Sequence, residues 1–174
     1  MNKSTKDELL GHHLPYELLM LRYTHREIQL TQPALRWNAL FESFAAHARV
    51  LHEFLTGKSD NRNAHATDLV PAFKPKKPEE VRGKINALNQ KILHLGTTRT
   101  ASPDDKVDLS DADTLFDWIE TNIVLLVGQL TPDDKVLWKP ERSEIGKADT
   151  TYIIAPVSAS ATNHIQIIRS QQTT

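Results

Sequence analysis

The segment Ala34–Thr56, ALRWNALFESFAAHARVLHEFLT, decides the fold class because it lacks proline and glycine and carries a helical apolar pattern. Its apolar residues recur three or four positions apart, a spacing that places them on one face of an α-helix. They are Leu40, Phe41, Phe44, Ala45, Ala48, Leu51 and Leu55. Pro33 precedes the segment and Gly57 follows it as a C-terminal glycine. At about 1.5 Å per residue the helix is about 35 Å long, so we predict that it is the central helix.

Three further helices are predicted from the same kind of pattern. Residues 16–29 follow a proline and carry a one-sided apolar stripe, and residues 78–95 carry a heptad-like apolar seam that opens on Pro78. Residues 115–130 form the fourth, with Ser110 as N-cap and an acid, Asp113, three positions later. The predicted fold class is therefore all-α, an up-and-down bundle of four main helices.

The remaining segments are predicted as connections and tails. We expect residues 1–13 to form a frayed arm and residues 58–78 a surface loop with one short turn near residues 67–69. The β-leaning runs TYIIA (151–155) and IQIIR (165–169) form either a short hairpin or a tail that a partner orders. Residues 1–138 are thus predicted as the helical bundle and residues 139–174 as an accessory C-terminal tail.

Composition excludes several classes of function. The 174 residues contain 21 Lys+Arg against 22 Asp+Glu, so the net charge does not favour binding to nucleic acid or to an anionic membrane. The absence of cysteine excludes disulfides and thiolate metal sites. No window approaches the length of a membrane span, and the first residues lack the apolar run of a signal peptide. No pair of histidines has helical i,i+4 spacing with a carboxylate partner. We expect a cytoplasmic protein with no membrane partner, no metal and no cofactor.

The candidate catalytic residues of the central helix are His47, Arg49 and His52. Arg49 and His52 lie three positions apart and share a helix face. A general base beside a cation that stabilises a phosphate is what RNA cleavage through its own 2′-OH requires. The alternative is structural: Arg49 pairs with Glu53 or Glu42, and the histidines border the core.

A second candidate cluster is His94 with Arg99, on either side of the predicted end of the third helix at Gly96. A histidine in the last turn of a helix is favoured by the helix dipole when protonated, which explains His94 in part. With two threonines between them, His94 and Arg99 also suit an anion. If the second and third helices are neighbours, His94 approaches His47 and Arg49. The three residues then form either an anion-binding site or a buried structural network of polar side chains.

The loop before the third helix carries the one clear local basic patch, Lys74, Lys76 and Lys77. Such a patch is a weak candidate for nucleic-acid contact, because short basic loops are usually solvated.

Two stretches carry a family resemblance: ALFESFAAHARVLHEFL (residues 39–55) and INALNQKILHLGTTR (residues 85–99). Together they resemble the HEPN superfamily, and most of all its branch related to an abortive-infection protein. The resemblance implies a helical bundle that forms a homodimer. Many HEPN proteins are metal-independent ribonucleases that use an arginine and a following histidine, but no arginine of this chain has a histidine at the family's spacing. This absence argues against catalysis by the arginine–histidine pair that these ribonucleases use.

The sequence therefore predicts a non-catalytic or atypical HEPN-like protein, an interaction or RNA-binding module in bacterial defence or a toxin–antitoxin system. Two alternatives stay open. One is a metal-independent ribonuclease with a non-standard site drawn from His47, Arg49, His52, His94 and Arg99. The other is a structural scaffold whose partner is a protein.

Overall fold

The computed structural model describes residues 2–30, 33–58, 63–93 and 107–145. Every regular element in these ranges is helical and none is a strand, which confirms the all-α prediction for the described part of the chain. The predicted hairpin at residues 151–155 and 165–169 lies outside these ranges. Within the described ranges, no helix combines the length and the apolar character needed to cross a bilayer.

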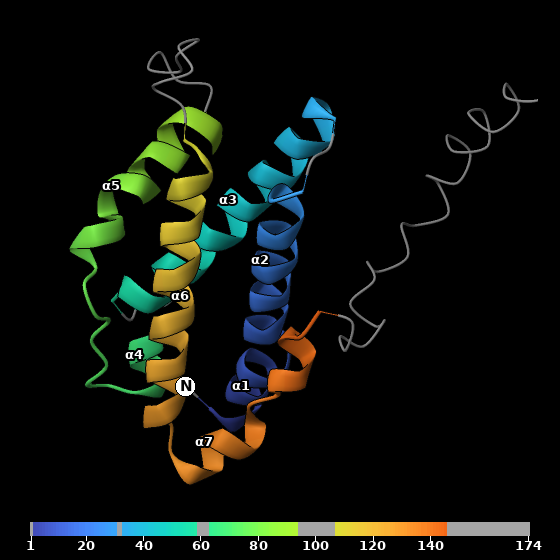
Figure 1. Cartoon of the computed structure of the whole chain (residues 1–174). Coiled ribbons are helices and arrows are strands. Elements are labelled where there is room, and N and C mark those ends of the chain that lie inside the picture. Colours follow the sequence, from blue (N-terminus) through green and yellow to red (C-terminus); the bar gives the residue numbers. More distant parts are fainter. Residues whose placement is uncertain (1, 31–32, 59–62, 94–106, 146–174) are drawn as a thin grey trace, which may run out of the picture.

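The central helix has the bounds that the sequence predicted. It is α3 (Ala34–Thr56), and it contacts α2 (Leu14–Ile28), α4 (Ala66–Leu69), α5 (Glu79–Leu88) and α6 (Leu109–Gln129). Figure 1 shows α2 and α6 side by side, with α3 running obliquely behind α6 and α5 on the far side of α6. The buried face of α3 holds the predicted apolar stripe apart from Leu40, which is half-buried, and adds Phe54.

The N-terminal residues do not form an arm, so that prediction was wrong. Residues Lys3–Glu8 form α1, and Leu9–His13 form one π-helical turn, η1, that leads into α2. Leu10 is fully buried and Leu9 is only 9% exposed. Leu10 lies four positions before Leu14 and continues the buried face of α2, although the polar residues around it suggest a surface segment.

The helices around residues 79–130 differ from prediction at their ends. Helix α5 passes at residue 89 into a second π-helical turn, η2 (Asn89–Leu93), and the predicted end near residue 95 lies outside the described residues. Helix α6 begins at Leu109, earlier than the predicted residue 115. Its N-cap is Asp108, whose carboxylate accepts a hydrogen bond from the N–H of Asp111 at 3.0 Å. Ser110 is therefore not the cap; aspartate is as good an N-cap and lies where the chain enters the helix.

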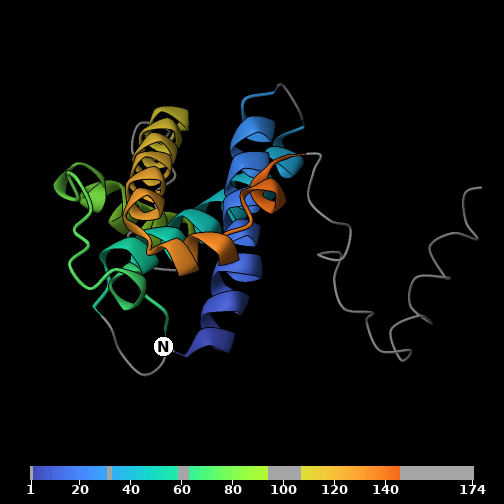
Figure 2. The ribbon, with the colours of Figure 1, turned by 90° about the horizontal axis from the view of Figure 1, so that it is seen from below.

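An additional helix, α7 (Pro132–Leu137), follows α6 in a stretch for which the sequence analysis predicted no helix. Thr131 caps it by accepting the Asp134 N–H at 3.1 Å, and Pro132 occupies the first turn. Asp134 is 4% exposed and forms a 2.8 Å salt bridge with Lys6, which ties α7 to α1. Seen from below, α7 continues from the end of α6 towards α2 (Figure 2).

The chain then packs back on α2 through a 3₁₀ turn, η4 (Pro140–Ser143). The Arg22 guanidinium of α2 donates to both carboxylate oxygens of Glu120 in α6, at 2.6 and 2.8 Å. It also donates to the carbonyl and the hydroxyl of Ser143, at 3.0 and 2.7 Å. One side chain thus joins α2, α6 and η4.

Candidate functional site

The three candidate residues of α3 have separate surroundings. His47 faces α2, where its Nδ1 lies 2.7 Å from Oε2 of Glu17 and the Tyr16 ring meets its ring edge-on at 6.0 Å between centroids. The imidazole is largely covered, with 15% of its side chain exposed. His47 therefore holds α3 to α2, and Glu17 is a partner that the sequence did not indicate.

Arg49 points to solvent, and the structural alternative proposed for it is not found. Arg49 is exposed, and no salt bridge joins it to Glu42 or Glu53 among the described residues. It is therefore available for a ligand, but no other candidate cation or base is held against it there.

His52 is half-buried on the side of α3 that faces α5 and α6, with its ring centroid 5.5 Å from that of Trp118. Burial lowers the pKa of His52 below its usual range; Glu53 opposes this shift and Arg82 adds to it. The imidazole is thus held mainly neutral at neutral pH, as a general base must be. Arg82 of α5 is a neighbouring cation that sequence reasoning missed, since only the packing of α5 on α3 reveals it.

His94 and Arg99 lie outside the described residues, so their meeting with α3 stays a prediction. What the structure adds is that η2, which ends at residue 93, contacts α3. Among the described residues, His47, Arg49 and His52 do not converge on one point and do not assemble a nucleophile, base and phosphate-binding group together.

The lysine patch lies on a loop that hydrogen bonds with α6 hold in place. The Lys76 N–H donates to Oδ1 of the fully buried Asn122 at 2.7 Å, and the indole N–H of Trp118 donates to the carbonyls of Lys76 and Lys77 at 2.7 and 3.1 Å. Lys77 has a φ of 48°, a left-handed conformation that is uncommon for lysine. The hydrogen bonds from α6 hold the loop in this conformation.

The side chains of this loop are not a uniformly basic surface. Lys74, Lys76 and Lys77 are all exposed, and the Nζ of Lys77 pairs with Glu80 at 2.7 Å. The hollow beside Lys76 and Lys77 is also lined by the carboxylates of Asp113 and Asp117 on α6. Opposite charges so close together do not favour a phosphate backbone, and nucleic-acid contact at these lysines stays a prediction.

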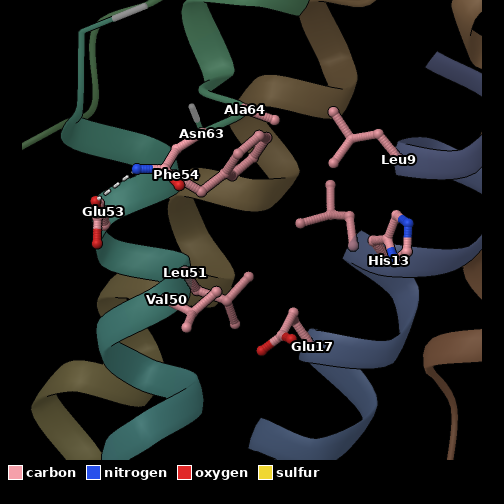
Figure 3. A pocket seen from close by; sticks show the side chains of 10 residues that line it. Leu9, His13, Glu17, Val50, Leu51, Glu53, Phe54, Asn63 and Ala64 are labelled. Carbon is pink, nitrogen blue, oxygen red and sulfur yellow. Dashed lines mark hydrogen bonds between the residues drawn. The ribbon is translucent and has the colours of Figure 1, made fainter. Parts of the chain in front are cut away.

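A mainly apolar groove lies between α2 and α3, called here the α2–α3 groove, with a volume of about 400 Å³. Figure 3 shows side chains from η1 and α2 on one wall, and from α3 and the segment before α4 on the other. The lining residues are Leu9, His13, Leu14, Glu17, Val50, Leu51, Glu53, Phe54, Asn63 and Ala64. Six of the ten are apolar, so the groove has an apolar floor with polar groups near its edges.

Two carboxylates supply the charge of this groove, one on each wall. Glu17 lies on α2 with 24% of its side chain exposed, and Glu53 is exposed on α3, where its Oε1 accepts a weak 3.5 Å hydrogen bond from Asn63. Neither lysine nor arginine is among the described lining residues. Sequence reasoning missed the groove because it assigned Leu9 and His13 to an arm.

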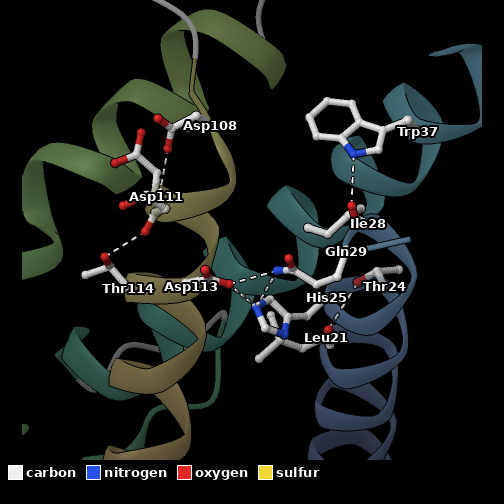
Figure 4. Close-up of polar contacts among 11 residues, drawn as sticks. Leu21, Thr24, His25, Ile28, Gln29, Trp37, Asp108, Asp111, Asp113 and Thr114 are labelled. Atoms are coloured by element: carbon white, nitrogen blue, oxygen red, sulfur yellow. Dashed lines mark hydrogen bonds and ion pairs between the residues drawn. The ribbon is translucent and has the colours of Figure 1, made fainter. Parts of the chain in front are cut away.

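A further polar cluster joins α2 to α6 and is structural. Oδ1 of Asp113 lies 2.8 Å from Nε2 of His25 and accepts a 2.8 Å hydrogen bond from the Gln29 amide, as Figure 4 shows. The His25 ring stacks on Phe116 with 4.0 Å between centroids and 4° between planes. The same figure shows the indole N–H of Trp37 on the Ile28 carbonyl, a 3.0 Å bond that fixes the start of α3 on α2.

This chain matches no protein-family model, no curated protein and no solved structure. Within the described ranges, no three His, Asp or Glu residues gather closely enough to hold a metal ion. The α2–α3 groove and the contacts of α3 are therefore the structural features that bear on function.

Proposed function

We propose that this protein is a non-catalytic protein-binding module built on a helical bundle. The observation that carries the proposal is the open, mainly apolar α2–α3 groove, with Val50 on its wall 48% exposed. Concave, mostly apolar sites of roughly 300–1,000 Å³ are typical ligand sites.

The contacts of the candidate catalytic residues support the non-catalytic part. His47 is bonded to Glu17, and its covered ring holds two helices together. His52 is half-buried against Trp118, and Arg49 stands exposed without a described partner. A ribonuclease needs a base and a phosphate-binding cation aimed at the same point, which these positions do not supply.

The biological setting is proposed on the family resemblance alone. Residues 39–55 form most of α3, so the resemblance falls on the helix that organises the bundle. A HEPN-like protein in bacterial defence or a toxin–antitoxin system, acting as a homodimer, is the setting that this resemblance suggests.

An RNA assay tests the proposal directly. Purified protein is incubated with mixed RNA in EDTA and then passed through an RNA-retention assay, with Arg49→Ala and His52→Ala beside the wild type. Arg26→Ala, which removes an exposed arginine of α2, is the matched control. We expect neither cleavage nor retention from any of the four proteins. Cleavage by the wild type that Arg49→Ala and His52→Ala abolish and Arg26→Ala preserves would establish a ribonuclease instead.

A further inference from the structure

We infer that the α2–α3 groove binds an amphipathic helix of a protein partner whose apolar side chains are flanked by lysine or arginine. The inference rests on the proposed function and adds the chemistry of the partner. It follows from the shape of the groove, from the uncovered apolar surface on its wall, and from the charges at its edges.

The shape favours a helix. One wall is helical, formed by η1 with α2, and the other is α3 with the non-helical residues Asn63 and Ala64 at one end. Most of the groove thus runs between two helices, as the seam of a three-helix bundle does. A third helix in such a seam inserts apolar side chains at positions i and i+3 or i+4. The floor of Leu14, Leu51 and Phe54 offers apolar contact to these side chains.

The uncovered surface on α3 indicates where the partner lies. Val50 is 48% exposed at the edge of the groove, directly beside the fully buried Leu51. A helix seated on the floor would cover the Val50 methyl groups and extend the core of the bundle. Burial of these methyl groups would contribute to the binding free energy in proportion to the apolar area that is covered.

The charge selects the kind of helix. Glu17 and Glu53 place one carboxylate on each wall, and the described lining holds no lysine or arginine. Oε2 of Glu17 already lies 2.7 Å from Nδ1 of His47, so Glu53 is the carboxylate more open to a basic partner. A partner with basic residues on both sides of its apolar stripe meets both carboxylates, whereas an acidic helix or an RNA backbone is repelled. Charges of this kind set the association rate and the choice of partner more than they set affinity.

The test is a selection without charge bias. A phage-displayed library of amphipathic helices of about 15 residues, a length that an isolated helix needs, is panned against the full-length protein. The enriched peptides are synthesised and their Kd is measured by calorimetry. We expect enriched sequences with large apolar residues at i and i+4, flanked by lysine or arginine.

Matched variants test whether an enriched peptide binds in the α2–α3 groove. Val50→Gln should weaken an enriched peptide by roughly tenfold, because the burial of one valine side chain is lost. Val124→Gln, at a 70% exposed valine of α6 outside the groove, should leave the Kd unchanged. Glu53→Lys should weaken binding, and Glu42→Lys, at an exposed acid of α3 outside the groove, should not. Circular dichroism confirms that each variant is folded.

The outcomes separate this inference from the proposed function. No enrichment, enrichment of acidic or uncharged helices, or equal effects of Val50→Gln and Val124→Gln would overturn the assignment of the groove, while absence of RNA cleavage would leave the non-catalytic proposal standing. Specific cleavage of RNA together with basic helices that depend on Val50 would overturn the proposed function and leave the groove assignment intact.

Discussion

Replacement of Gly57 by alanine tests why a glycine follows the central helix. The sequence predicted Gly57 as a C-terminal glycine, a position where glycine commonly takes a left-handed backbone. Gly57 instead has φ −66° and ψ 158°, which any residue can adopt. The reason is space. A Cβ at Gly57 would lie 2.2 Å from Nδ1 and 2.4 Å from Cε1 of His65, and 2.6 Å from the carbonyl oxygen of Glu53.

The surroundings offer little relief from this overlap. His65 is only 3% exposed, so its ring has no open space to enter, and the Glu53 oxygen belongs to the helix backbone and accepts the Gly57 N–H at 2.7 Å. Overpacking of a well-filled site costs about 1–3 kcal/mol, so we expect Gly57→Ala to lower the free energy of unfolding by that amount.

Gly83→Ala is the matched control, because a Cβ there meets nothing within 4 Å and Gly83 lies exposed inside α5. It should raise the free energy of unfolding by about 0.5–1 kcal/mol, since alanine is the better helix former. Urea denaturation followed by circular dichroism measures both changes, which are expected to have opposite signs.

A double-mutant cycle with His65→Ala identifies the clash as the cause. His65→Ala alone should destabilise the fold by leaving a cavity, but the double variant should be less destabilised than the sum of the two single changes, because the alanine Cβ occupies part of the space of the lost ring. The reasoning is refuted if Gly57→Ala behaves like Gly83→Ala, or if the two single effects add.

Three further predictions concern polar side chains. Arg22→Ala should lower the free energy of unfolding by about 1–2 kcal/mol in urea, because Glu120, a quarter exposed, loses a bidentate partner; a neutral result would show the pair to be dispensable. Asn122→Ala should cost about 1–3 kcal/mol in thermal unfolding, because it removes the hydrogen bonds that a fully buried amide makes to the loop before α5; an unchanged Tm would contradict this. Because burial and Arg82 lower the pKa of His52, its contribution to the free energy of unfolding should be fully present above pH 6.5 and lost as the pH falls through the folded pKa. His52→Gln should reduce this pH dependence of stability. Arg82→Ala should raise the pKa of His52 in an NMR titration. Identical titration curves with and without Arg82 would exclude this electrostatic effect on His52.

The sequence was most informative where a signal is contained within a few neighbouring residues. The bounds of α3 and the short turn near residues 67–69, which is α4 (Ala66–Leu69), follow from apolar spacing, prolines and caps. The same signals were insufficient at the N-terminus. There the apolar pair Leu9 and Leu10 lies among charged residues and histidines, which obscured that Leu10, Leu14 and Leu18 lie four positions apart on one buried helix face.

The sequence alone was enough to predict that the described part of the chain is helical, where its central helix lies and most of the buried face of that helix, because local periodicity fixes which residues share a face. The tertiary structure alone shows that His47 pairs with Glu17, 30 positions away, and that His52 packs against Trp118. It also brings the charge of Arg82 close enough to lower the pKa of His52, and it forms the groove between α2 and α3. These contacts depend on how each helix is rotated and crossed against its neighbours. That arrangement is set by the packing of the whole core and not by the spacing of residues within one helix.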